Sequence, residues 1–320
     1  MKLPPRRLRR HLTGPLLLED RTTPATFNAT INPATDPAGA VAELVTLFND
    51  ANADPGTSET INLYAGGTYE FNSPANLQDG GTALPVLFES NPAILYSPGY
   101  VPKTFTINGM GDTFDRPAGA PSMRFLRAVG QVDVTQIPVD DIHAKGPTLV
   151  VNDLSFNNGN TFDYSGGNFT DPTLFPVLDG GAIRLDNADV VATDVSFTNN
   201  TTSDNGGAVA VDGRLGFLGN SEFDGATFDG NDAGLVGGAV VVNQTDTAPA
   251  IETLVTFMQS SLTNNLSLTG AGGAGGELVE YDLNQTLVQN NEGTVGGVSG
   301  TLVRTNGSLF DANVATGGGP

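Results

Sequence analysis

The polar and apolar residues of this chain follow two different periods, one after the other. Between Val41 and Phe48, apolar residues recur at the helical spacing i, i+3, i+4, i+7, directly after Asp36-Pro37, a pair suited to a helix start. This spacing predicts one amphipathic helix over residues 36–53. Beyond the helix, apolar and polar residues alternate in short runs bounded by glycine and asparagine, which predicts strands joined by turns.

Two short signatures alternate between residues 180 and 319. One is a pair of glycines that leads into a small apolar run, and the other is Phe or Leu followed three residues later by Asn. The glycine pairs begin at Gly180, Gly206, Gly237, Gly275 and Gly296, and the second signature begins at Phe197, Phe228, Leu262, Leu287 and Phe310. Self-similarity with a period of roughly 20 to 50 residues is typical of solenoids. Each pair of signatures therefore predicts one coil of a solenoid.

Each recurring position has an expected role in such a coil. The Phe or Leu should point inward and stack as an apolar column, because equivalent residues of successive coils lie above one another. The Asn should stand at a turn, where it tolerates left-handed dihedral angles and its amide can bond to the next coil. The glycine pair should supply a positive φ or a close approach of two backbones. The predicted ladder residues are Phe197, Asn200, Gly206, Gly207, Phe228, Asn231, Gly237, Gly238, Leu262, Asn265, Leu287, Asn290, Phe310 and Asn313.

These patterns predict an all-β fold, a single-stranded right-handed parallel β-helix with one N-terminal capping α-helix. We expect residues 1–35, which are basic and then rich in Pro and Thr, to form a tail or export leader. Residues 36–320 are expected to form the β-helix, with its clearest repeats at 180–319. Because solenoids need covered ends, we also expect further coils or a partner over the C-terminal end, as in a fragment of a longer autotransporter-like passenger.

The chain resembles two modules of bacterial surface proteins. The order of the helix, Ala51-Asn52, Pro55-Gly56, Thr60-Ile61 and Gly67-Thr68-Tyr69 resembles the second half of the N-terminal module named CSLREA, although the Cys-Ser-Leu-Arg part is absent. The Gly-Gly-Ala-Ile and Phe-x-x-Asn segments resemble the polymorphic outer membrane protein repeat. Residues 18–25 resemble a short signature of exported bacterial proteins. Together these resemblances imply an extracellular or outer cell-surface β-helix protein.

Charge restricts the class of partner. The chain has a formal net charge of -21, and six of its 14 basic residues lie in the first 21 positions, so the rest is still more acidic. Such a surface repels phosphate backbones, which argues against nucleic acid as a partner, and it suits cations or solubility outside the cell. Carbohydrate or a host or neighbouring cell surface is the partner expected of a surface scaffold. The chain has no cysteine and no run of about 18 apolar residues, so neither disulfides nor a transmembrane helix is expected.

Catalysis is the alternative to a scaffold role, because parallel β-helices also host polysaccharide lyases and glycoside hydrolases. Such enzymes need carboxylates that converge, with a basic residue or Ca²⁺ in the lyases. The best candidates are Arg184, Asp186 and Asp189, followed by Asp224, Asp229 and Asp232. Alternation along a strand puts Arg184 and Asp186 on one face and Asp189 on the other. Neither His11 nor His143 stands in a catalytic motif.

The sequence thus favours an exported surface or adhesion scaffold without catalytic activity, cofactor or specific metal site. Loose Ca²⁺ binding at acidic turns is a weaker expectation. We expect ligand binding in the segments that interrupt the period, residues 72–101, 157–179 and 243–253, or on a lateral strand face.

Overall fold

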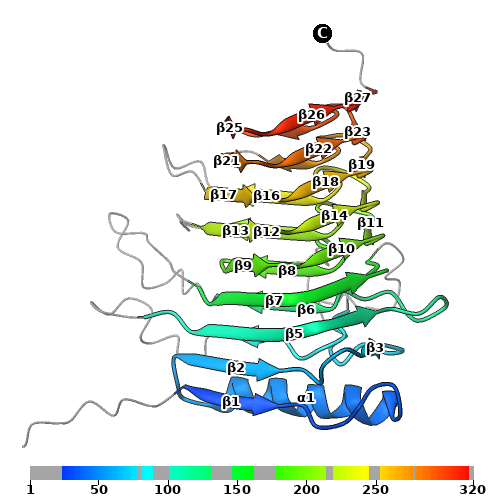
Figure 1. Ribbon diagram of the computed structural model, residues 1–320, viewed down its shortest axis with the longest axis vertical. Helices are drawn as coiled ribbons and strands as arrows, with labels where there is room; N and C mark the ends of the chain where they lie inside the picture. Colours follow the sequence, from blue (N-terminus) through cyan, green and yellow to red (C-terminus); the bar gives the residue numbers. More distant parts are fainter. Residues whose placement is uncertain are drawn as a thin grey trace, which may run out of the picture.

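The protein is a stack of parallel strands curled into a half-barrel, with one helix at its N-terminal end (Figure 1). The structure is a computed structural model that describes residues 24–77, 81–88, 101–130, 146–161, 178–213, 219–244, 253–276 and 278–316. Every pairing between the named strands of these ranges is parallel, and the strands form three sheets. The β-rich, parallel character expected from the alternating pattern is confirmed.

The largest sheet has 15 strands and holds the longest ones. It contains β1 (Ala25–Asn28), β2 (Ser58–Asn62), β3 (Thr68–Glu70), β5 (Thr104–Asp115), β7 (Thr148–Asn157), β9 (Asp189–Thr193), β10 (Ser196–Thr198), β13 (Asn220–Asp224), β14 (Thr227–Asp229), β17 (Thr253–Met258), β18 (Ser261–Thr263), β21 (Val279–Asn284), β22 (Leu287–Gln289), β25 (Leu302–Asn306) and β26 (Leu309–Asp311).

Two smaller sheets complete the half-barrel. The seven-stranded sheet contains β4 (Leu87–Phe88), β6 (Leu126–Val129), β8 (Ile183–Asp186), β12 (Val209–Gly213), β16 (Val240–Gln244), β20 (Ala274–Gly276) and β24 (Val298–Ser299). The five-stranded sheet contains β11 (Thr201–Thr202), β15 (Asp232–Ala233), β19 (Leu266–Ser267), β23 (Glu292–Gly293) and β27 (Val314–Ala315).

From β8 onward the chain visits the sheets in a fixed order. One strand of the seven-stranded sheet is followed by two of the fifteen-stranded sheet and one of the five-stranded sheet, as in β8, β9, β10 and β11. Strands four apart in sequence pair with each other, so β12 lies on β8, β13 on β9 and β14 on β10. We call each such set of four strands a layer. Successive layers lie about 4.8 Å apart, the distance between paired strands.

The helix α1 (Pro37–Ala53) lies against the first strands, at the opposite end of the stack from β27 (Figure 1). Asp36 begins it as the N-cap, with its carboxylate accepting a hydrogen bond of 2.9 Å from the Gly39 N–H. Leu44 and Phe48 are fully buried against the sheets. The helix expected over residues 36–53 is therefore present.

A buried lysine completes the other end of α1. The Lys103 ammonium donates hydrogen bonds of 2.7 Å to the carbonyl oxygens of both Ala51 and Asp54, where the helix leaves its carbonyl groups without internal partners. The carboxylate of Glu59 lies 3.6 Å away and is equally buried. This contact ties the end of the helix to β2 and β5.

The expectation of a tail over residues 1–35 was wrong for its last part. Ala25–Asn28 forms β1, which pairs in parallel with β2, and Phe27 packs against the core. The strand has four residues, too few to display an alternating period, and pairing with β2 is what orders it. The earlier residues of the expected tail lie outside the described ranges.

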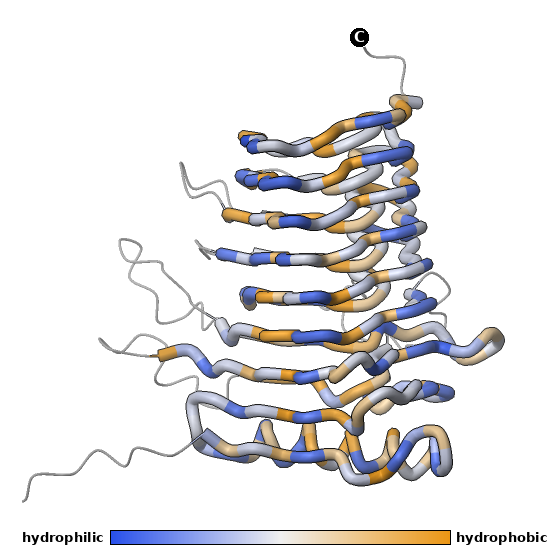
Figure 2. The backbone as a smooth tube through the Cα atoms, in the orientation of Figure 1, coloured by the Kyte–Doolittle hydropathy of each residue, from blue (hydrophilic) through white to orange (hydrophobic). Residues whose placement is uncertain are grey.

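An apolar column of aromatic and aliphatic side chains fills the interior. Phe156, Phe197 and Phe228 lie in register on neighbouring strands, and the rings of Phe197 and Phe228 stack with their centres 4.7 Å apart. Leu262 continues the column. Figure 2 shows hydrophobic positions recurring from layer to layer.

The fourth member of the column differs from the prediction. Val288, not Leu287, pairs with Leu262 below and Phe310 above, whereas Leu287 occupies the outward position that Ser261 holds in the preceding layer. Both residues are apolar, so the sequence did not distinguish the two registers, and a shift by one residue reverses the face of each side chain. Phe310 ends the described column and is 44% exposed.

A buried asparagine ladder runs beside this column. The backbone N–H and the side-chain Nδ2 of Asn200 both donate to Oδ1 of Asn231, each over 3.0 Å, and the same pair of bonds joins Asn231 to Asn265. Each Nδ2 also donates to a backbone carbonyl oxygen of the preceding layer. The members of the ladder are Asn200, Asn231, Asn265, Asn291 and Asn313.

Two expectations about this ladder need correction. The fourth member is Asn291 and not Asn290, through the same shift by one residue as in the apolar column. The left-handed dihedral angles belong to the residue before each ladder member, as at Asn199, Gly230 and Asn290, where φ is 54°, 65° and 54°. The ladder Asn is therefore a buried hydrogen-bonding residue, and its predecessor makes the turn.

The first three glycine pairs play both predicted roles. Gly206 has a φ of 69°, and a Cβ on the adjacent Gly207 would collide with the carbonyl oxygen of Gly238 in the next layer. The pair at 275–276 is different, because Val240 pairs with Ala274, which makes Ala271 and Gly272 the equivalents of Gly237 and Gly238. By the same register, Gly296 rather than Gly297 is equivalent to Gly238.

Within the described residues, α1 is the helix of the structure, and it is neither long nor apolar enough to cross a membrane.

Candidate functional site

Charged side chains converge on the outer face of the seven-stranded sheet. Strand alternation turns Ile183 and Leu185 of β8 inward, so Arg184 and Asp186 face outward. Asp186 is in register with Asp212 of β12, which is in register with Asn243 of β16. We define the ionic cluster by six residues, which are Arg127, Asp179, Arg184, Asp186, Asp212 and Asn243.

Ion pairs connect three strands within the cluster. The guanidinium of Arg184 lies 2.7 Å from one oxygen of Asp186, and its Nε lies 3.1 Å from Asp212 on the neighbouring strand. Arg127 of β6 donates from Nε to the other oxygen of Asp186, also over 2.7 Å. Asp186 is thus held between two guanidinium groups.

Asp179 joins the cluster from the segment that leads into β8. Its Oδ1 accepts hydrogen bonds from the backbone N–H and the side chain of Asn205, at 2.9 and 3.0 Å. The Nδ2 of Asn243 donates to Asp212 over 2.9 Å and to Asp179 over 3.2 Å. One amide therefore bridges two buried carboxyl groups.

The carboxyl groups of the cluster differ in their affinity for a proton. Burial raises the pKa of Asp212 to about 7, and the nearby Asp179 adds to the shift. Burial also raises the pKa of Asp179, with Asp204 adding to it. Burial alone would raise the pKa of Asp186 too, but Arg184 and Arg127 outweigh it and hold that pKa below its ordinary value.

This arrangement combines features of a catalytic site and of a structural network. Asp212, whose pKa is raised to about 7, stands in register with the ionised Asp186, and an acid paired with an ionised carboxylate is the combination that glycoside hydrolysis uses. The burial of the charged side chains is typical of a structural network instead, because Arg184 is only 2% and Asp212 only 7% exposed. Asp186 is more accessible, with 15% of its side chain exposed.

The predicted candidates separate in the structure. Arg184 and Asp186 meet in the ionic cluster, whereas Asp189 lies on β9 in the fifteen-stranded sheet and accepts a hydrogen bond of 2.7 Å from the Asn220 N–H. Asp229 accepts hydrogen bonds from Thr263 and Asn264 of the next layer. Both His11 and His143 lie outside the described residues.

Four members of the cluster were not singled out from the sequence, and a signal for two of them was present. Asp186, Asp212 and Asn243 each stand five residues after the second glycine of a pair, at Gly181, Gly207 and Gly238. Equivalent positions of successive layers lie side by side, so this recurrence of a carboxyl or amide group indicates a polar column. Arg127 and Asp179 lie outside the repeated signatures and left no comparable signal.

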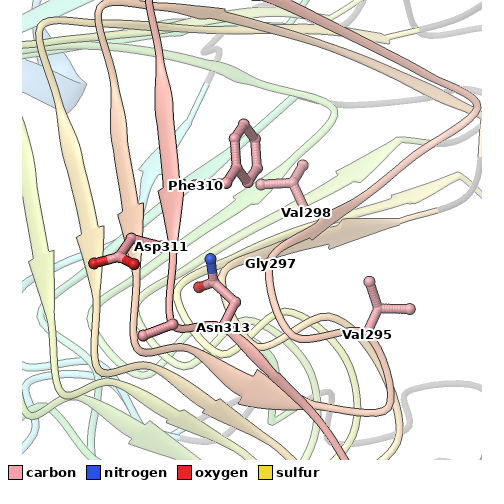
Figure 3. A pocket seen from close by; sticks show the side chains of 7 residues that line it. Val295, Gly297, Val298, Phe310, Asp311 and Asn313 are labelled. Atoms are coloured by element: carbon pink, nitrogen blue, oxygen red, sulfur yellow. The ribbon is translucent and has the colours of Figure 1, made fainter.

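Two shallow hollows lie elsewhere on the described surface. One, of about 330 Å³, lies between α1 and residues 75–76 and 85–88 and is lined by Val45, Asn49, Asn52 and Phe88, among others. The other, of about 400 Å³, lies on the last layer, where Phe310 and Val298 point toward each other beside Gly297 (Figure 3). Neither hollow adjoins the ionic cluster.

Among the described residues, no group of three or more His, Asp or Glu side chains is placed to hold a metal ion. The expected binding segments 72–101, 157–179 and 243–253 fall in large part outside the described ranges.

In comparisons with known proteins, no family model, no curated protein and no solved structure matches the chain.

Proposed function

We propose that the chain is a right-handed parallel β-helix that acts as an exported, non-catalytic binding scaffold on the outer surface of a bacterial cell. The observation that carries this proposal is the outer face of the fifteen-stranded sheet. Its outward side chains are polar for most of its length and lie in register from β1 to β25. A broad, rigid face of this kind suits contact with an extended surface better than a small-molecule pocket does.

The internal bonding supports the same role. The asparagine ladder satisfies buried polar groups in layer after layer, and rigid packing lowers the entropy cost of binding a partner. The acidic character of the chain favours solubility outside the cell. The proposed location on the bacterial cell surface rests on the resemblance to the CSLREA module and to the polymorphic outer membrane protein repeat.

Two measurements test this proposal. Protease treatment and antibody labelling of intact cells should reach the protein if it is on the surface. Incubation of the pure protein with acidic and neutral polysaccharides should release neither reducing ends nor unsaturated products. Turnover of any of them at an enzyme-like rate would contradict the scaffold role.

The ionic cluster favours a second candidate, a glycoside hydrolase. In that mechanism Asp212, which holds its proton near neutral pH, serves as the acid and the ionised Asp186 as the nucleophile or base. Asp212→Asn and Asp186→Asn would then each abolish product release, whereas Asp224→Asn, on the fifteen-stranded sheet, would not. If turnover survives both cluster substitutions, this second candidate is wrong.

A further inference from the structure

The outer face of the fifteen-stranded sheet carries a neutral patch on β1, β2 and the first halves of β5 and β7, which Asp115 and Asp153 follow in the second halves of the last two strands. Eleven outward side chains of β1, β2, β5 and β7 form it, and none of them is charged. They are Thr26, Asn28, Ser58, Thr60, Asn62, Thr104, Thr106, Asn108, Thr148, Val150 and Asn152. All are half-buried or exposed, and Figure 1 shows no labelled element in front of these strands.

The patch ends where charge begins on the same sheet. The column that contains Thr60, Thr106 and Val150 continues upward through Val191, and then through Glu222 and Asp282. The column of Asn108 and Asn152 continues through Thr193 to Asp224. Both columns therefore carry carboxylates above the patch, with the neutral Thr256 in the first column and the neutral Met258 and Asn284 beyond Asp224 in the second.

Side-chain hydrogen bonds hold one edge of the patch in a fixed arrangement. The Nδ2 of Asn152 donates to Asn108, that of Asn108 to Asn62, and that of Asn62 to Asn28, over 2.9, 2.7 and 2.8 Å. The amide groups are thereby oriented before any ligand arrives. Little side-chain entropy remains to be lost on binding, which favours affinity for a ligand that matches this arrangement.

We infer that the neutral patch binds an uncharged, extended polysaccharide that lies flat on the sheet. This inference rests on the proposed scaffold function and names its partner. Hydroxyl and amide groups at a constant spacing can exchange hydrogen bonds with the hydroxyl groups that an extended polysaccharide repeats along its length. Polyanions fit less well, because none of the eleven side chains is cationic and the carboxylates around the patch, Asp153 beside Asn152 and those of the layers above, repel them.

The test makes the same substitutions inside the patch and outside it, at positions that are in register on different strands of the sheet. Thr60→Val and Thr106→Val together remove two hydroxyl groups of the patch while keeping β-branched side chains, and Thr106→Lys places a charge in its centre. Thr256 lies in the same column on β17, outside the patch, and Thr256→Val and Thr256→Lys are the matched controls. The readout is co-sedimentation with insoluble cellulose, chitin and mannan, with polygalacturonate and chitosan as charged comparisons. Thermal unfolding of each variant verifies its fold.

The wild-type protein should sediment with at least one neutral polysaccharide, with little change between low and high salt. The Thr60/Thr106 double variant should bind about tenfold more weakly, as expected for two hydrogen bonds of about 0.5–1.5 kcal/mol each. Thr106→Lys should bind still more weakly, and both Thr256 controls should bind as the wild type does.

Three other results would each contradict a specific part of the inference or of the proposed function. If the protein binds a polysaccharide or cells but the patch variants equal the Thr256 controls, the patch is not the site, while the scaffold function stands. Salt-sensitive binding to charged polymers alone contradicts the neutral ligand. If the protein binds no polysaccharide and no cell surface, both the inference and the scaffold function are wrong.

Discussion

Replacement of one ladder asparagine tests whether the ladder stabilises the stack. Asn231 is fully buried, and its Oδ1 accepts from both the N–H and the Nδ2 of Asn200. Its own Nδ2 donates to the carbonyl oxygen of Phe197 and to Asn265. Asn231→Ala removes all of these side-chain bonds without altering the apolar column.

The expected cost follows from the groups left without partners. The backbone N–H of Asn200 loses its acceptor and the carbonyl of Phe197 loses a side-chain donor, whereas Oδ1 of Asn265 still accepts from the backbone N–H of residue 231. At about 1–3 kcal/mol for each buried polar group that is left unsatisfied, the variant should lose about 3–5 kcal/mol of its free energy of unfolding. The side chain of Asn200 keeps its bonds to the carbonyl oxygen of Phe156 and to the N–H of Gly159, which places the loss below the upper sum.

Asn313→Ala is the matched control, because Asn313 makes the same bonds to the layer below but is half exposed. Water can replace its side chain, so we expect a loss of only about 1 kcal/mol. Urea unfolding followed by far-ultraviolet circular dichroism measures both variants, compared at equal m-value. A loss for Asn231→Ala no larger than that for Asn313→Ala would refute the reasoning.

Three further predictions concern other buried groups. Burial raises the pKa of Asp112 from 3.8 to about 6, so the folded state binds this proton more tightly and the stability contributed by the group falls as pH rises from about 4 to 6. Asp112→Asn should therefore raise the free energy of unfolding at pH 7 by up to about 3 kcal/mol, seen as a higher melting temperature, and leave both unchanged near pH 4. Lys103→Met should cost about 3–5 kcal/mol in urea unfolding, because it leaves the carboxylate of Glu59 buried without its cation, and adding Glu59→Leu should restore part of the loss. Gly207→Ala should cost about 3 kcal/mol or more, the upper end for overpacking, because its Cβ would collide with the carbonyl oxygen of Gly238. Gly66→Ala, with open space around its Cβ, should cost only about 1–2 kcal/mol for its positive φ, and equal losses in thermal unfolding would contradict the close approach at Gly207.

The parts of the fold that the sequence predicted are those in which several constraints agree. The helix at Pro37–Ala53 has a cap, a proline and an apolar face, and the first glycine pairs recur together with a Phe and an Asn. Errors arose where only one constraint was present. Glycine is tolerated at many backbone positions, so the pair at 275–276 did not fix the register, which is set by buried side chains such as Ala274.

The candidate site was predictable only in part. Arg184 and Asp186 are two residues apart, so strand alternation alone places them on one face. Asp212 is brought beside them by the stacking of layers, and recognising it requires the correct register between β8 and β12. The positions of Arg127 and Asp179 in the cluster are set by segments outside the repeated signatures, so no local sequence pattern predicts them.

The asparagine ladder also gives the stack a direction. Within each ladder step, the N–H and Nδ2 donors belong to the earlier layer and the Oδ1 acceptor to the later one, from Asn200 through to Asn313. A layer that has just formed therefore exposes donors that only its successor along the chain can satisfy. Folding that proceeds from α1 in chain order completes one layer at each step, and such an order suits a chain that leaves the ribosome N-terminus first.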